Sequence, residues 1–156
     1  MNRLQKLLKL LKLTEYLETF KITICDDCDT VHIEPLMTTA QADATSKLAH
    51  LSGVQVLFAR PEENQTGNSD YHQDYIGTAV FVLEKGLGLD KTQDLENIQY
   101  KRLLMISDAI LGKIADDTSG DDCTLVSGLS LSSVQITPEA SIFGGWSGWS
   151  IELSFE

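Results

Sequence analysis

The last segment of the chain alternates apolar and polar side chains without a break. Its apolar members would share one face of a strand, with serines and glutamates on the other face. A period of two is typical of a strand that is buried on one face only. Gly144 and Gly145 provide a turn just before it. We therefore predict a final strand inside a sheet, with one face formed by Trp149, Ile151, Leu153 and Phe155.

The longest helical pattern covers residues 92–117. Thr92 is a candidate N-cap, because its hydroxyl can accept a hydrogen bond from a backbone N–H that the helix leaves unpaired. Gly120 predicts the stop. We expect Asp116 and Asp117 to lie in solvent in a frayed last turn, since carboxylates are unfavourable at the negative end of a helix. The apolar stripe of this helix is formed by Leu103, Ile106, Ile110 and Ile114.

Residues 3–19 form a second amphipathic pattern, with leucines on one side and lysines on the other. Two interpretations are open: the helix packs on the protein's own sheet, or it presents its apolar side to a membrane surface or a partner. We favour packing within the chain, because Tyr16, Leu17 and Phe20 extend the apolar side past the lysine-rich part. The leucines at helical spacing are Leu4, Leu7, Leu8 and Leu11.

Several shorter segments have the composition of strands. Residues 54–59 and 75–83 predict a hairpin, joined by a polar loop over 61–74. Loops of that length are usually either functional or disordered, and here we expect an interaction surface. Residues 22–24 and 31–34 predict a shorter hairpin around an acidic turn.

The remaining pattern completes an α+β fold. We expect a short helix within 38–51, strands at 123–126 and 132–136, and a loop that opens at Pro138. The order of helix, strands, long helix and strands predicts a mainly antiparallel sheet. The N-terminal helix and the one long helix should pack on it, in a single domain of residues 1–156. The strand residues expected under the long helix are Val80, Val82, Trp149, Ile151 and Leu153.

Composition and charge exclude some functional classes. The 156 residues are 42% hydrophobic and 22% charged, and the formal net charge is −11. Residues 1–21 hold five basic and two acidic side chains, so the rest is strongly acidic. We expect no sequence-specific nucleic-acid binding, because phosphates are bound by Lys and Arg. No apolar run reaches the roughly 18–20 residues of a membrane span, and no signal peptide is recognisable. We therefore expect a cytoplasmic protein without a membrane partner.

No segment carries a specific catalytic motif. Cys25 and Cys28 form a CxxC pair, but the two aspartates between them would raise the thiol pKa that a redox site needs to be low. Cys123 and His32 could complete a zinc site, although no spacing supports it. No nucleophile motif, phosphate-binding loop or dinucleotide motif is present. We expect a protein that is not an enzyme and holds no cofactor or metal.

The order of elements resembles that of small phage head–tail completion and tail-terminator proteins. The likeness is carried by residues 75–83, by the helical segment 102–114, and by the Gly145–Trp149 segment that runs into 151–155. The resemblance implies a ring-forming, non-catalytic subunit of a phage or prophage tail or neck, which would be a component of the virion. Its partners would be copies of itself and other tail or neck proteins, and an acidic channel would repel DNA.

Interface residues are expected in the polar loop and in the tryptophan pair. An exposed tryptophan pair would anchor an interface; alternatively Trp149 belongs to the core and Trp146 covers the sheet edge. The full set of candidate interface residues is Asn64, Asn68, Tyr71, Tyr75, Trp146 and Trp149.

Two other functional classes stay open. The chain could be a small monomeric cytoplasmic domain that binds or regulates a protein partner, using its basic N-terminal helix. It could also be a metal or redox protein that uses Cys25 and Cys28. The oligomeric state separates the first class from a ring subunit, and the metal content of the purified protein tests the second.

Overall fold

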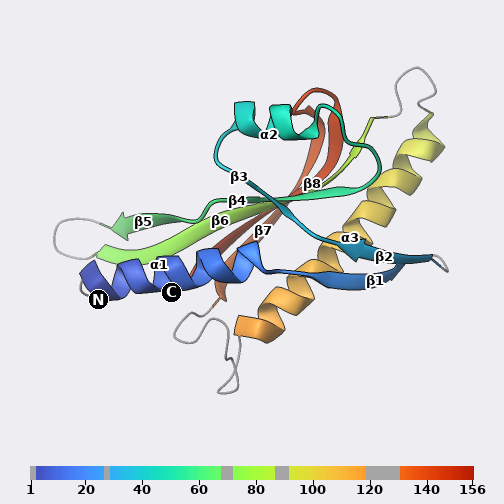
Figure 1. Ribbon diagram of the computed structural model, residues 1–156. Helices are drawn as coiled ribbons and strands as arrows, with labels where there is room; N and C mark the ends of the chain where they lie inside the picture. Colours follow the sequence, from blue (N-terminus) through green and yellow to red (C-terminus); the bar gives the residue numbers. More distant parts are fainter. Residues whose placement is uncertain (1–2, 27–28, 68–71, 87–91, 119–130) are drawn as a thin grey trace.

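The computed structural model describes residues 3–26, 29–67, 72–86, 92–118 and 131–156 (Figure 1). Within these ranges each helix is followed by a run of two or three strands. Their order is α1 (Arg3–Glu18), β1 (Ile22–Asp26), β2 (Asp29–Ile33), β3 (Leu36–Thr38), α2 (Gln41–Leu48), β4 (Gln55–Ala59), β5 (Glu62–Gly67), β6 (His72–Lys85), α3 (Gln93–Thr118), β7 (Leu131–Ile142) and β8 (Trp146–Phe155).

The main sheet has the strand order β3-β4-β6-β8-β7. β5 also belongs to this sheet: it pairs with the first part of β6, and β4 pairs with the last part of β6 on the same side. These pairings are antiparallel, apart from the parallel pairing of β3 with β4. β1 and β2 form a separate antiparallel pair. The predicted α+β class, with a mainly antiparallel sheet and a long helix, is confirmed.

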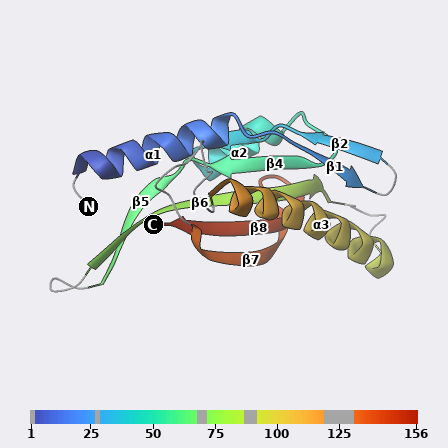
Figure 2. The ribbon, with the colours of Figure 1, turned by 90° about the horizontal axis from the view of Figure 1, so that it is seen from below.

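Helices cover both faces of the sheet (Figures 1 and 2). α3 and the second half of α1 pack on one face, where they meet alternate side chains of β4, β6 and β8. α2 covers part of the opposite face, where Ala44 and Leu48 pack against Leu57, Leu83 and Trp146. The two clusters are separate because successive residues of a strand point to opposite sides of the sheet.

The predicted packing of the long helix is confirmed. Thr92 caps α3, since the Leu95 N–H donates a 3.2 Å hydrogen bond to the Thr92 hydroxyl. The predicted apolar stripe is at most 1% exposed. It shares one cluster with the strand residues expected under it, of which Trp149 is partly buried. The predicted stop at Gly120 lies outside the described residues.

The final strand is also confirmed, as β8 between β6 and β7. Ile151, Leu153 and Phe155 are at most 1% exposed, whereas Glu152 on the other face is exposed. Gly144 and Gly145 form the turn before it, with φ of 89° and 101°. Such positive φ values favour glycine because a Cβ would clash with the backbone.

The end of α3 differs from the prediction at Asp117, whereas Asp116 is exposed as expected. The Tyr16 hydroxyl donates a 2.5 Å hydrogen bond to the Asp117 carboxylate, and the Lys113 ammonium donates to the same oxygen at 3.1 Å. Tyr16 belongs to α1 and is only 3% exposed. The C-terminal ends of α1 and α3 are therefore joined, and the negative helix end is compensated by Lys113.

β7 is longer than predicted. The strand expected at 132–136 is present, but it continues to Ile142, and the prediction of a loop at Pro138 is wrong. Pro138 pairs with Trp149 of β8 in the register of the sheet. A proline is tolerated there because β7 lies at the border of the sheet, where an N–H on the outer side is not required. The strand expected at 123–126 lies outside the described residues.

The hairpin of β4 and β6 also contains more strand than was predicted. β4 and β6 pair antiparallel as expected, but much of the predicted 61–74 loop is strand: Glu62–Gly67 pairs with the start of β6. Backbone hydrogen bonds extend the hairpin without needing apolar side chains. The β1–β2 hairpin and the short helix within 38–51 are confirmed. β3 was not predicted, because three residues carry too little pattern.

The first half of α1 contradicts the prediction that its leucine face packs on the sheet. Leu4, Leu7, Leu8 and Leu11 are 48% to 64% exposed. Lys6 instead faces the body of the protein, where its ammonium lies 3.5 Å from a Glu63 carboxylate oxygen of β5. The buried residues of the helix lie in its second half: Leu13, Tyr16 and Leu17.

The core model predicts that Ile110→Asp unfolds the protein. Ile110 is fully buried, and an unpaired carboxylate there costs several kcal/mol, a large part of the roughly 5–15 kcal/mol that stabilises a domain. The matched control is Met105→Asp, because Met105 lies on the same helix and is 63% exposed. It should change the free energy of unfolding by about 0.5 kcal/mol or less. A cooperatively melting Ile110→Asp variant, followed by circular dichroism, would contradict this packing.

A second stability test compares two glycines. A Cβ at Gly148 would lie 2.0 Å from the Val82 carbonyl oxygen of the neighbouring strand, whereas a Cβ at Gly112 of α3 would have no atom within 4 Å. Gly148→Ala should therefore destabilise the protein by about 1–3 kcal/mol or more. Gly112→Ala should stabilise it by up to about 1 kcal/mol, as expected in a helix. Chemical denaturation measures both, and equal effects at the two positions would show that β6 and β8 are not so close.

Candidate functional site

β7 forms one border of the main sheet, seen beyond β8 in Figure 2. It pairs with β8 on one side and, among the described residues, with no strand on the other. The backbone N–H and C=O groups of that side can therefore pair with another chain. Natural edge strands often discourage such pairing with charged side chains, but Glu139 is the single charged residue in the β7 sequence.

The β7 border also exposes apolar side chains. Val134 and Ile136 are 40% and 42% exposed. They stand opposite Leu153 and Ile151 in the register, so they lie on the face that α3 covers. Neither residue was among the predicted interface residues, although their alternation with serine, glutamine and threonine is the pattern of a strand with one apolar face.

α3 fixes the position of this border strand. The Tyr100 hydroxyl donates a 2.6 Å hydrogen bond to the Glu139 carbonyl of β7, and the Trp149 indole N–H donates a 2.8 Å bond to the Tyr100 carbonyl. One turn after Tyr100, Leu104 points towards the same side of the helix and is 38% exposed. We name Leu104, Val134 and Ile136, with the outer backbone of β7, the β7 edge.

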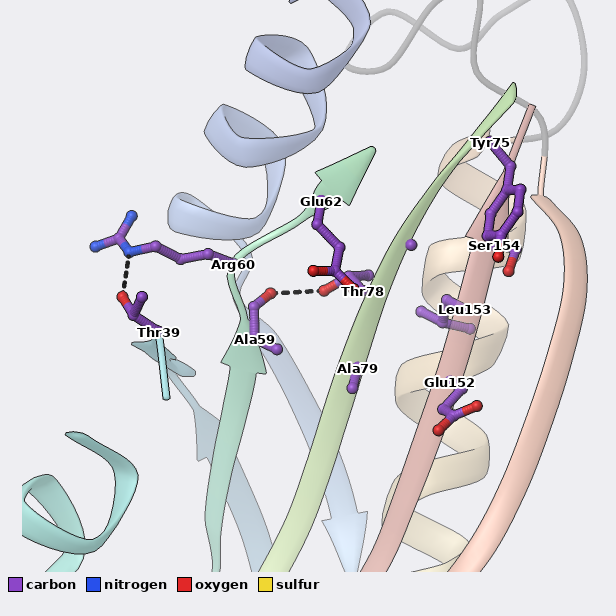
Figure 3. Close-up of a pocket in the computed structure, with 11 residues that line it drawn as sticks. Thr39, Ala59, Arg60, Glu62, Tyr75, Thr78, Ala79, Glu152, Leu153 and Ser154 are labelled. Atoms are coloured by element: carbon purple, nitrogen blue, oxygen red, sulfur yellow. Dashed lines mark hydrogen bonds between the residues drawn. The ribbon is translucent and has the colours of Figure 1, made fainter. Parts of the chain in front are cut away.

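An open hollow of about 440 Å³ lies on the opposite face of the sheet, beside α2 (Figure 3). Gly77 and Ala79 form part of its floor, and their small size leaves the surface of the sheet accessible. Arg60 and Glu62 lie along one side. The Arg60 guanidinium donates a 3.1 Å hydrogen bond to the Thr39 hydroxyl, which holds it at the rim.

Of the charged residues that line the hollow, Arg60 has an ion-pair partner within the chain. The Arg60 guanidinium lies 3.9 Å from a Glu18 carboxylate oxygen. On α2, hydrogen bonds from the Lys47 ammonium and from the Thr39 backbone N–H hold the pKa of Asp43 below its ordinary value. These contacts fix the segment between β3 and α2.

The candidate interface residues that the structure describes lie in different parts of the fold. Asn64 lies in β5, and Asn68 and Tyr71 lie outside the described residues. Tyr75 is half-buried and lines the hollow, where Figure 3 shows it beside Ser154. Tyr75 therefore lies in a strand of the sheet, within the segment 75–83 that was predicted as a strand.

The tryptophan pair belongs to the interior of the sheet. Trp146 is 1% exposed and packs in the cluster under α2, which corrects its assignment as an exposed interface anchor. Trp149 is half-buried against the core under α3, and its ring meets the Tyr100 ring edge to face at 5.9 Å. The physical reason is that both faces of β8 are covered at this end, by α3 on one side and α2 on the other.

The cysteine pair is described only in part. Cys25 is an exposed free thiol on β1, while Cys28 and Cys123 lie outside the described residues. His32 bonds to the Thr23 hydroxyl across the hairpin at 2.9 Å. In the described ranges, no three His, Cys, Asp or Glu side chains are grouped as metal ligands would be. A metal or redox role for Cys25 and Cys28 therefore stays an untested alternative.

No helix in the described ranges is long and apolar enough to cross a membrane. In comparisons with known proteins, no family model and no curated protein sequence matches this chain.

Proposed function

We propose that this protein is a self-assembling structural subunit: a non-catalytic, ring-forming part of a phage or prophage tail or neck. The β7 edge is the observation that supports the proposal most. It combines a 12-residue strand that is unpaired on its outer side, among the described residues, with exposed apolar side chains. Strand pairing through this edge would extend the sheet of one copy into the next.

The proposed ring requires a head-to-tail contact. A β7 edge that met a second β7 edge would close with two copies, whereas a β7 edge that meets a different border of its neighbour can close a ring. β5 is a suitable acceptor, because it pairs with β6 on one side and belongs to a hairpin at one end of the molecule (Figures 1 and 2). We propose β7 against β5 as the repeating contact.

The charge of the chain fits a place on the path of DNA. Each copy carries a net charge of −11, so a ring lined by acidic side chains would repel DNA phosphates and let the duplex pass. The same charge makes the copies repel one another. We propose that the protein is made in the cytoplasm and enters the virion through contacts with itself and with other tail or neck proteins.

The β7 contact is tested with Ile136→Lys. The new charge should weaken self-association at least about tenfold, because it would be buried against the neighbouring copy. Melting of the monomer should change little, since Ile136 is 42% exposed. The measurement is sedimentation velocity over a range of protein concentrations.

The matched control for Ile136→Lys is Gln135→Lys, which makes the same charge change on the other face of the same strand. Because either substitution lowers the net negative charge, charge alone would favour association in both. Equal association of the two variants would therefore count against the β7 edge as the contact.

Salt provides a second test. Screening shortens the reach of the repulsion to about 8 Å at physiological ionic strength, so the weight-average mass should rise as sodium chloride rises from about 10 mM to 300 mM. A mass that falls with salt would mean that ion pairs drive the contact. A strict monomer under every condition, including high protein concentration, would instead favour the monomeric binding or regulatory domain.

A further inference from the structure

β7 is closed to strand pairing along its second half. Pro138 has no backbone N–H, so a strand added there would lose a hydrogen bond of the ladder. The register of β7 with β8 shifts between Glu139 and Ile142, and Ser141 has a φ of 52°, far from an extended strand. Proline residues, charges and bulges are the means by which natural sheets protect their borders from other chains. All of them gather in residues 138–142.

Glu139 adds two further obstacles to a neighbouring strand. Its carboxylate accepts a 2.9 Å hydrogen bond from the Ser150 hydroxyl, which holds the charge beside the border. Its backbone carbonyl accepts the 2.6 Å hydrogen bond from the Tyr100 hydroxyl. A strand that approached this part of β7 would exclude water from the carboxylate, and burial of a charge without a counter-charge is unfavourable. The second half of β7 is therefore protected by side chains as well as by its backbone.

The first half of β7 carries none of these features in Ser133–Thr137, which we name the open segment. Its residues are uncharged, and their register with β8 is continuous. Val134 and Ile136 expose their apolar side chains on the face that α3 covers. A register shift between Leu131 and Ser133 marks the other end of the open segment. The open segment is therefore the part of β7 that an added strand can follow.

The backbone of the open segment presents hydrogen-bonding groups outward at alternate residues. A proline fits an edge strand where its missing N–H would have pointed away from the sheet, so the position of Pro138 points outward. Directions alternate along a strand, so the N–H and C=O groups of Val134 and Ile136 also point outward. Those of Gln135 and Thr137 point to β8. Val134 and Ile136 therefore provide both the apolar side chains and the backbone groups of this border.

A side-chain hydrogen bond supports this direction. The Ser132 hydroxyl of β7 donates a 3.0 Å bond to the Ser154 carbonyl, so this carbonyl faces β7. Because directions alternate along β8, the backbone groups of Ile151 face β6. Ile136 is the register partner of Ile151 in β7, so its own N–H and C=O point away from β8 and are left for another chain.

The other borders of the main sheet decide which strand of a second copy can pair with the open segment. β3 is three residues long, and the Lys47 ammonium donates a hydrogen bond to its Met37 carbonyl. A short strand covered by a lysine is a protected border. β5 is six residues long and, in the described ranges, has a strand on one side only. A head-to-tail contact needs a border other than β7, and β5 is the one that remains.

We infer that β5 of a second copy pairs with β7 along Ser133–Thr137 alone, and that Pro138 determines where the added strand ends. The inference rests on the proposed self-assembly and names the register of its repeating contact. A ladder that can form at one end of β7 only places each copy at the same angle to the next. A closed ring requires this, because a rotation that varies between neighbours does not close.

The test follows amide hydrogen exchange at single residues, in the dilute monomer and in the assembled sample that sedimentation velocity identifies. Exchange in the assembled sample is stopped at intervals and read by NMR after return to the monomer. The amides of Val134 and Ile136 should exchange freely in the monomer and at least about tenfold more slowly in the assembly. Those of Gln135 and Thr137, directed to β8, should be protected in both. The Ala140 amide is the control, since it has no register partner in β8 and should not change.

A pair of proline variants tests the direction of the backbone groups. Ile136→Pro removes an outward N–H, so the monomer should keep its melting behaviour, as Pro138 allows. Its association should be weaker by about tenfold or more than that of Ile136→Ala, which keeps the N–H. Thr137→Pro is the matched control, since it removes an N–H that points to β8 and should lower the melting temperature of the monomer instead. An unfolded Ile136→Pro beside a folded Thr137→Pro would contradict the assigned direction.

The exchange experiment separates this inference from the proposed function. An oligomer in which Val134 and Ile136 exchange as freely as in the monomer would overturn strand pairing and leave self-assembly standing. Protection of these amides already in the monomer would overturn it too, because the border would be covered within one copy. Protection that reaches Ala140 would show that Pro138 does not end the ladder. Protection of β7 without a change in Glu62–Gly67 would exclude β5 as the partner. A strict monomer would remove both proposals.

Discussion

The antiparallel pairing of β6 with β8 is the constraint on which the rest of this structure depends. The ladder runs from the Ile76–Phe155 pair to the Lys85–Trp146 pair and is the longest continuous pairing among the described strands without a register shift. Gly148 allows the two backbones to approach where any side chain would collide with Val82. α3 packs on one face of the ladder and α2 on the other, while β4 and β7 pair with its two sides. The β7 edge and the hollow are both positioned by this central pair.

That arrangement leaves apolar surface where the core ends. β8 pairs with β6 on one side and with β7 on the other, and β7 forms the border of the sheet. Val134 and Ile136 of β7 are therefore only partly covered. Removing exposed apolar area from water stabilises an association by about 25 cal/mol per Å². The backbone groups of a free edge add a directional component that side chains alone lack. Association with another chain is the process that satisfies both at once, which is why we interpret the border as a contact surface rather than as a defect.

α1 likewise leaves apolar side chains uncovered. Its second half is anchored by Leu13, Tyr16 and Leu17, and this anchor determines which side of the whole helix faces the body. The leucines of the first half lie on the opposite side, so burying the anchor exposes them. Lys6 then lies beside Glu63, where an ion pair offsets the cost of its partial burial. The same helix therefore packs in the core with its second half and exposes apolar side chains with its first half.

The local sequence determined those helices and strands whose apolar pattern or capping residue can be recognised within a few neighbouring residues. The alternation in 149–155, the stripe from Leu103 to Ile114 and the Thr92 cap could all be read correctly, because each depends on neighbours in the chain. Tertiary structure alone decided which face of α1 is covered, where β7 ends and that Trp146 is buried. Those outcomes depend on partners far away in sequence, such as Asp117 for Tyr16. Periodicity shows that a helix or strand has an apolar face, but the free energy of packing against distant elements decides what covers that face, if anything does.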